Sequence, residues 1–236
     1  MACSSVGRVH IPDGLIDAPT SAVAAVVAIG GVGVSLRRAG EVLDDRGVPL
    51  AGLTAAFVFA AQMLNFPVAS GTSGHLIGGL LAAVLVGPTV GVVCVTVVLV
   101  VQALLFADGG LSALGLNIVN LALVPALLGY PVFVGLRQLL PRSRASIVLA
   151  SGVAAGITVV LASLAFVAEY AVGGVGGAPV STVAGAMVGT HVLIGIGEGV
   201  ITALVVGAVL STRPDLVWGA RDRVVRRTAQ PVVEPV

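Results

Sequence analysis

The chain has 236 residues, of which 57% are hydrophobic and only 10% are charged, and its mean hydropathy is +1.11. A soluble domain carries roughly 25% charged residues, so this composition excludes an ordinary soluble protein and favours one whose surface faces lipid. The net charge of +1 gives no excess of basic groups for an acidic partner, and no nucleic acid is expected to bind.

Breaks at Gly, Pro and charged residues divide the chain into seven predicted helices of an all-α polytopic membrane protein. Their approximate ranges are 17–37, 50–69, 75–87, 88–107, 113–138, 145–171 and 183–211. A helix that spans a bilayer needs about 20 apolar residues, and the third predicted helix is short by that measure. The count is six or seven, depending on whether this helix spans alone or forms a bent unit with the fourth at Gly87-Pro88.

The arginines favour seven transmembrane helices, with the N-terminus outside and the C-terminus in the cytoplasm. Cytoplasmic loops are enriched in Lys and Arg, and all the fixed positive side chains of this protein are arginines. In the seven-helix arrangement every arginine except Arg8 lies on the cytoplasmic side, in the loops after the first and fifth helices and in the C-terminal tail. Six helices would place the clusters on opposite sides of the membrane.

The same topology gathers the unusual polar residues near the external face. His10 precedes the first helix, His75 opens the third, and His191 and Glu198 share one face of the seventh because they lie two turns apart. Asp108, with the two glycines after it, is interpreted as an external turn. Ionisable side chains inside a membrane are costly and usually functional.

A nitrogen-rich metal site is the chemistry that three histidines in this position favour, because imidazole suits zinc, nickel, copper and cobalt. His10 and His75 are the better ligand candidates, since both lie in loops rich in small residues, where the backbone can approach a ligand closely. Supporting or packing roles are expected for the other polar residues, with direct ligation by His191 or Glu198 left open.

Four stretches resemble the CbiM/NikM family: "HIPDGLI", "AAQMLNFPVASGTSGHLIGG", "VQALLFADGGLSALGLNIVN" and "HVLIGIGEGVITALVV". Members of that family are the metal-binding subunits of energy-coupling-factor transporters for cobalt and nickel, and the likeness runs from His10 to about Leu210. The resemblance implies a seven-helix subunit of the bacterial plasma membrane that carries Ni²⁺ or Co²⁺ as transported ions and is not an enzyme. It also implies separate partner chains: ATPase subunits, a transmembrane coupling subunit and a small accessory membrane subunit.

The resemblance further implies a set of metal ligands. In the family these are the N-terminal amine, the backbone nitrogen and imidazole of a histidine in second position, and one further imidazole. His10 and His75 match the two histidines, and Asp13, Ser73, His191 and Glu198 are candidates for supporting them. The motifs "HIPDG" and "TSGHLIGG" are more similar to the nickel-type members.

This chain departs from the family at its start, because the histidine follows Val9 rather than an initiator methionine. A GUG valine codon can also initiate translation, so Val9 is expected to be the true start and to supply the amine. Residues 1–8 are then a dispensable extension, residues 9–211 the membrane-embedded metal-binding part, and residues 212–236 a cytoplasmic Arg-rich tail.

Two alternative functions remain open at the level of sequence. The "GTSG" stretch at 71–74 fits the G-x-S-G pattern of a rhomboid-like intramembrane serine protease, in which Ser73 would pair with His191. The pattern is weak in a chain with 32 glycines. A self-sufficient secondary metal carrier is the second alternative, although the helix interruptions lie at helix ends rather than at the midplane.

Overall fold

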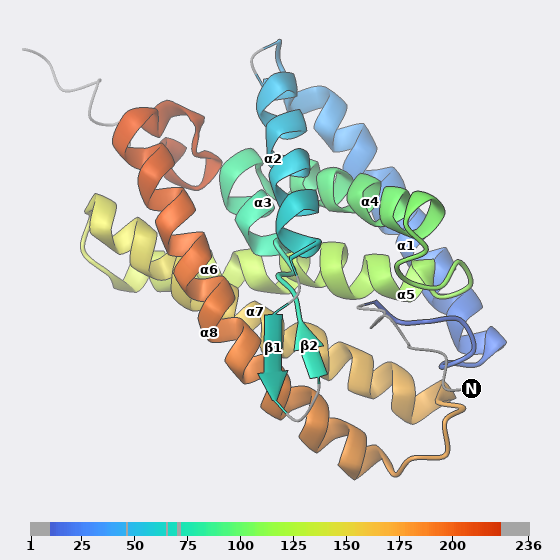
Figure 1. Cartoon of the computed structure of the whole chain (residues 1–236). Helices are drawn as coiled ribbons and strands as arrows, with labels where there is room; N and C mark the ends of the chain where they lie inside the picture. Colours follow the sequence, from blue (N-terminus) through green and yellow to red (C-terminus); the bar gives the residue numbers. More distant parts are fainter. Residues whose placement is uncertain (1–9, 46, 65, 70–71, 223–236) are drawn as a thin grey trace, which may run out of the picture.

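The computed structural model describes residues 10–222 except 46, 65, 70 and 71, and gives only the backbone of the other residues between 66 and 74. It is a helical bundle with one small hairpin (Figure 1). The helices are α1 (Ala18–Val42), α2 (Gly47–Gln62), α3 (Gly79–Val86), α4 (Pro88–Leu105), α5 (Leu114–Ile118), α6 (Tyr130–Leu139), α7 (Arg144–Gly173) and α8 (Val180–Thr212). Strands β1 (Phe66–Ala69) and β2 (Thr72–Gly74) pair antiparallel.

Five helical stretches in the described part of the chain are long and apolar enough to cross a membrane: Ala18–Val42, Pro88–Leu105, Leu114–Leu139, Arg144–Gly173 and Val180–Thr212. Helix α2 has 16 residues, and α3 has only eight. Eight residues rise about 12 Å, well short of the roughly 30 Å of a hydrocarbon core. The helical fold is therefore confirmed, whereas a count of seven full spans is not.

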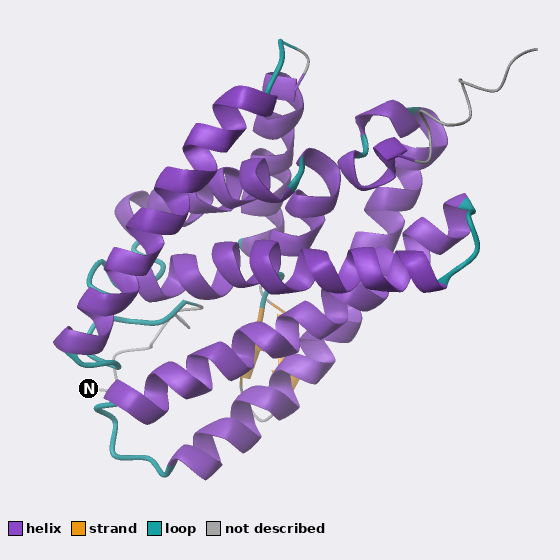
Figure 2. Cartoon of the chain, turned by 180° about the vertical axis from the view of Figure 1, so that it is seen from behind, coloured by secondary structure: helices purple, strands orange, loops and turns teal. Residues whose placement is uncertain are grey.

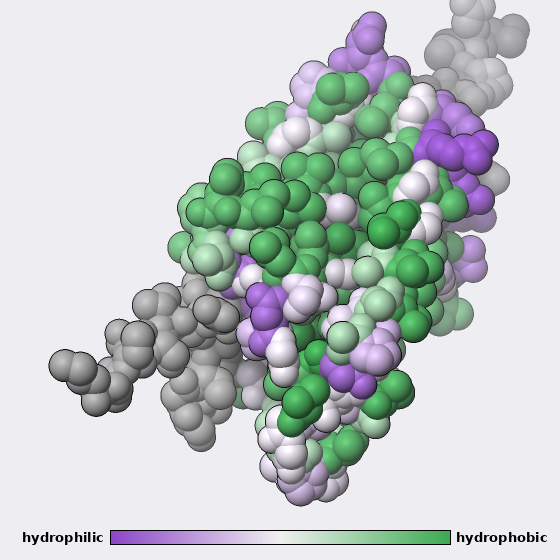
Figure 3. All heavy atoms as spheres, turned by 90° about the vertical axis from the view of Figure 1, so that its right-hand side faces the viewer, coloured by the Kyte–Doolittle hydropathy of each residue, from purple (hydrophilic) through white to green (hydrophobic). Residues whose placement is uncertain are grey.

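Apolar side chains dominate the outer surface. Val26 and Ile29 of α1 are about 70% exposed, and Ile196 and Leu204 of α8 are more than 60% exposed. Figure 3 shows hydrophobic residues over most of one face, with hydrophilic groups at its upper end and others in its lower half. So much exposed apolar surface is typical of contact with lipid.

The prediction of a helix over 50–69 is wrong beyond Gln62. Helix α2 ends there, and the chain turns into the β1–β2 hairpin. Pro67 lacks an N–H group and disfavours helical geometry in the residue before it, which weighs against a helix at this point. The predicted third helix is likewise shortened at its start, since residues 75–78 are not helical.

The predicted helix 113–138 is observed as one continuous stretch, Leu114–Leu139, which widens in its middle. Two π-helical turns occupy its centre, η1 (Val119–Leu123) and η2 (Pro125–Gly129). Pro125 cannot donate the usual helical hydrogen bond, and π turns are a common local response to such interruptions. This stretch carries the two asparagines described below, Asn117 and Asn120.

Glycines bring α7 and α8 into close contact along their length (Figure 2). A Cβ atom added at Gly152 would lie 2.8 Å from the carbonyl oxygen of Gly199, and one added at Gly195 would lie 2.8 Å from that of Gly156. Small residues four apart on both helices allow backbones to approach in this way inside membranes. The contact holds the part of α8 that carries His191 and Glu198 against the bundle.

The start of the C-terminal tail is packed against the bundle. The 3-10 turns η3 (Pro214–Leu216) and η4 (Trp218–Ala220) follow α8, and Val217 and Ala220 are fully buried. Arg137 of α6 donates to the Gly219 carbonyl and to Asp222, the latter at 2.7 Å. Residues 223–236, which hold three of the tail arginines, lie outside the described residues.

The non-helical segment before α3 is fixed by two buried side chains. The Glu198 carboxylate, which is 2% exposed, accepts hydrogen bonds from the backbone N–H groups of Ile77 at 2.6 Å and Gly78 at 2.8 Å. From α2, the Gln62 side-chain amide donates to the Ile77 carbonyl at 2.7 Å. Backbone groups that lack helical partners inside a membrane must be satisfied by other protein groups, and these contacts do so.

Replacement of Glu198 by alanine should destabilise the protein strongly. The change leaves two buried N–H donors without an acceptor, and each such loss costs about 1–3 kcal/mol. The matched control is Thr202→Val one turn further along α8, because the buried Thr202 hydroxyl has no hydrogen-bond partner among the described residues. Thermal unfolding in detergent should show a large drop for Glu198→Ala and almost none for the control; equal behaviour would contradict this role.

Candidate functional site

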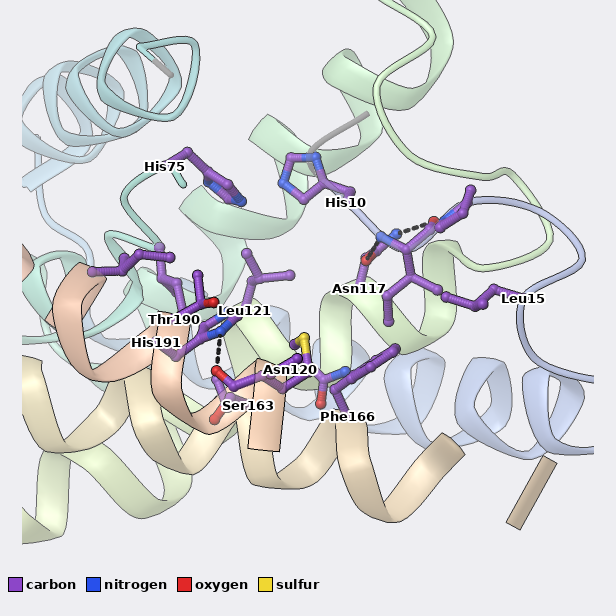
Figure 4. Close-up of a pocket in the computed structure, with 17 residues that line it drawn as sticks. His10, Leu15, His75, Asn117, Asn120, Leu121, Ser163, Phe166, Thr190 and His191 are labelled. Atoms are coloured by element: carbon purple, nitrogen blue, oxygen red, sulfur yellow. Dashed lines mark hydrogen bonds between the residues drawn. The ribbon is translucent and has the colours of Figure 1, made fainter. Parts of the chain in front are cut away.

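A cavity of about 330 Å³ lies where the N-terminal loop, the segment before α3, and helices α5, α7 and α8 meet. All three histidines of the protein line it, from three different elements: His10, His75 and His191 (Figure 4). Most of the remaining lining is apolar, and its polar members include Asn117, Asn120, Ser163 and Thr190. The structure thus brings together the three imidazoles that the sequence placed near one face.

The N-terminal loop that carries His10 is held by its backbone. The Asn117 side chain accepts from the Ile11 N–H at 3.0 Å and donates to the Ile11 carbonyl at 3.3 Å. The N–H of Gly110 donates to the same carbonyl at 2.9 Å. These contacts fix the residue next to His10 and so limit where the imidazole can lie.

Asp13 secures the same loop from outside the cavity. Its carboxylate accepts from the backbone N–H of Ser112 at 2.8 Å and also from the Ser112 hydroxyl. Asp13 does not line the cavity. Its part in the site is to tie the turn after His10 to the loop that follows α4.

Asp108 is more than the simple external turn that the sequence suggested. Its carboxylate oxygen lies 3.3 Å from His10 Nδ1, and both side chains are largely buried. Gly109, at φ +93°, lies against the base of the His10 side chain, and a Cβ there would lie 3.0 Å from His10 Cβ. The sequence did hint at this role, because Asp108 is an acid at the end of a long uncharged run, and ionisable residues in such positions usually have a function.

His75 lies in the segment before α3 with its ring beside that of His10. The two ring centroids are 4.9 Å apart, and the planes meet at 61°. His75 Nδ1 is 2.7 Å from the Leu76 carbonyl, which can only accept, so Nδ1 carries the proton and Nε2 keeps its lone pair. A neutral imidazole with a free lone pair is the form that binds metals.

His191 shows the same arrangement on α8. Its Nδ1 lies 2.7 Å from the carbonyl of Met187, one turn earlier, so the proton again sits on Nδ1. Glu198, in contrast, does not line the cavity and acts on the segment that carries His75. His191 and Glu198 were predicted to share one helix face, and they have different roles: His191 lines the cavity, and Glu198 binds the backbone of Ile77 and Gly78.

Two of the sequence-derived site residues cannot be placed in this geometry. Val9 lies outside the described residues, and so does the side chain of Ser73, whose backbone forms part of β2. The predicted Ser73–His191 pair therefore lies outside the described residues, and the described hydrogen bond of the His191 ring is to the Met187 carbonyl.

Glu169 is a half-buried acid that the sequence analysis missed. It accepts a hydrogen bond at 2.7 Å from the side-chain amide of Asn120, which lines the cavity. The signal was present, because Glu169 is an isolated acid near the end of a 30-residue apolar helix. Among the described residues, no three His, Cys, Asp or Glu side chains come close enough to hold a metal ion by themselves.

Comparisons with known proteins agree on the family. Residues 10–216 match CbiM, the cobalt uptake substrate-specific transmembrane region. A putative metal transport protein of Haloquadratum walsbyi is 38% identical over 89% of this chain and 93% of its own length. A putative fused nickel transport protein NikMN of Archaeoglobus fulgidus is also 38% identical, over 88% of this chain and 68% of its own.

Curated and solved relatives extend this agreement. The cobalt transport protein CbiM of Geobacter sulfurreducens is 35% identical over 88% of this chain and 61% of its own length. The crystal structure of a truncated transition metal transporter superposes with a TM-score of 0.76 at 31% identity, covering 86% of this chain and 99% of that one. With these matches and its apolar helices, the chain is a multi-pass membrane protein and belongs to the CbiM family of cobalt and nickel transport components.

Proposed function

We propose that this chain captures Ni²⁺ or Co²⁺ at the external face of the bacterial plasma membrane for an energy-coupling-factor importer. One observation carries the proposal: the imidazoles of His10 and His75 lie side by side in one cavity, and the loop that carries His10 is fixed by Asn117. The ATPase subunits, the transmembrane coupling subunit and a small accessory membrane subunit are separate chains. The bundle spans the membrane seven times, with its C-terminus in the cytoplasm.

The ligand set combines side chains with backbone nitrogens. His75 contributes Nε2, and His10 contributes its imidazole together with its backbone nitrogen. The amine at position 9 completes four nitrogens when translation begins there. Fused chelate rings of amine, amide and imidazole favour a planar site, which suits nickel particularly well. A site of this kind takes only two of its ligands from side chains. It therefore does not need a cluster of three His, Cys, Asp or Glu side chains, which the described residues do not form.

Asp108, Asn117 and Asp13 position His10 rather than bind the ion. Metal-binding imidazoles are usually oriented by contacts to carboxylates or carbonyls, and losing such a contact weakens binding by about 10–100-fold. His75 is oriented by the Leu76 carbonyl, while Glu198 and Gln62 hold the backbone on which it sits. The two imidazoles are therefore placed before the ion arrives.

Replacing His75 by alanine should abolish tight metal binding, because it removes one of four nitrogens from the planar site. His191→Ala should lower the metal content less, and Ser73→Ala should leave it unchanged. Nickel and cobalt content after purification measures the effect. Full retention of metal by His75→Ala would remove His75 from the site, whereas loss of function with Ser73→Ala would favour the protease alternative.

The N-terminus gives a second prediction. Mass spectrometry of the native protein should find methionine followed directly by His10. A chain forced to keep residues 1–8 should bind nickel much more weakly than one that begins with methionine at position 9, since the extension removes the amine. Equal binding by the two forms would show that the amine is not a ligand.

Orientation can be tested by cysteine labelling in a chain whose Cys3 and Cys94 have been replaced by alanine. Leu111→Cys, in the exposed loop after α4, should react only with an impermeant reagent added outside the cell. Arg142→Cys, between α6 and α7, should react only after the inner face is opened. Labelling of position 111 from the inside alone would overturn the seven-span topology.

A further inference from the structure

The far wall of the cavity holds a third imidazole that the capture site does not use. Figure 4 shows His10 and His75 on one side of the cavity, and His191, Asn120 and Ser163 on the other. His191 is oriented as His75 is, by a backbone carbonyl at 2.7 Å that fixes the proton on Nδ1. Its Nε2 lone pair is therefore available for coordination.

Asn120 supplies an oxygen on the same wall. Its amide nitrogen donates to Glu169 on α7 at 2.7 Å, which fixes the orientation of the amide group. The Asn120 side-chain oxygen is buried and has no hydrogen-bond partner within the described structure, although the residue is only 4% exposed and lines the cavity. A buried acceptor without a donor costs free energy, and a bound cation would satisfy it.

Charge and space at this wall also suit a cation. Glu169 lies directly behind the Asn120 amide and can offset positive charge in the cavity. The volume of about 330 Å³ exceeds what one ion on His10 and His75 requires, and leaves room for an ion with bound water. Imidazole nitrogen and amide oxygen are both accepted ligands of divalent nickel and cobalt.

We propose a second metal position in this cavity, formed by His191 Nε2, the Asn120 side-chain oxygen and water, which takes Ni²⁺ or Co²⁺ after release from the capture site. This inference rests on the proposed function, since it assumes that the ion first binds at His10 and His75. With two protein ligands in place of four, the second position binds more weakly. A weaker site next to a tight one lets the ion leave the tight site without entering an apolar space unligated.

The experiment is a Co²⁺ titration of the purified chain in its native N-terminal form, followed by calorimetry and by the visible absorption of bound cobalt. The wild type should bind two ions, one tightly and one weakly. His191→Ala should keep the tight ion and lose the weak one, whereas His75→Ala should lose the tight ion and keep the weak one. Asn120→Leu should weaken the second ion about tenfold, a change of about 1.4 kcal/mol, with the first unaffected.

Leu193→Ala is the matched control, because it shortens a side chain on the same helix that is 51% exposed on the outer surface. It should bind both ions as the wild type does, and the tight ion reports folding in every variant that retains His75. A single ion per wild-type chain, with His191→Ala unchanged, would overturn the second position and leave the proposed function intact. A single ion whose cobalt spectrum changes in His191→Ala would instead make His191 a ligand of the capture site. Absence of any cobalt binding would reject both proposals.

Discussion

The hydrogen bonds from Ile77 and Gly78 to the Glu198 carboxylate are the constraint on which the site depends. They allow four residues of non-helical backbone to lie inside an apolar bundle, where each unsatisfied N–H group would cost free energy. Gln62 satisfies the carbonyl of the same segment from the opposite side. Without this segment α3 would begin earlier, and His75 would lie on a helix rather than over the cavity.

The N-terminal loop faces the same requirement and meets it with different residues. Asn117 and Gly110 satisfy the backbone of Ile11, and Asp13 binds Ser112 at the outer edge. Each of the two loops that carry a candidate ligand is thus fixed by polar groups from a distant part of the chain. The rigid parts of the bundle, above all the α7–α8 pair, provide the frame on which these loops rest.

Local pattern was enough to predict the membrane class, the break at Gly87-Pro88 and the long helices α7 and α8, because long apolar runs and their interruptions are properties of neighbouring residues. The β1–β2 hairpin was not predicted, because Phe66, Val68 and Ala69 are as apolar as the residues of a membrane helix. Pro67 is the one residue of β1 that argues against a helix. The partners of Glu198 and Asn117 were not predictable, since they lie 121 and 106 residues away in sequence. The convergence of His10, His75 and His191 followed from topology, whereas the contact between His10 and Asp108 required coordinates.

Asn117 recognises Ile11 only through the N–H and C=O groups that nearly every amino acid has. The side chain at position 11 takes no part in these hydrogen bonds and instead packs into the lining of the cavity. The number of residues between His10 and Asp13 matters to the site, because one inserted residue would shift the imidazole by about 3.3 Å, roughly the length of one extended residue. The length of this loop therefore sets the position of the His10 imidazole as directly as the identity of its side chains does.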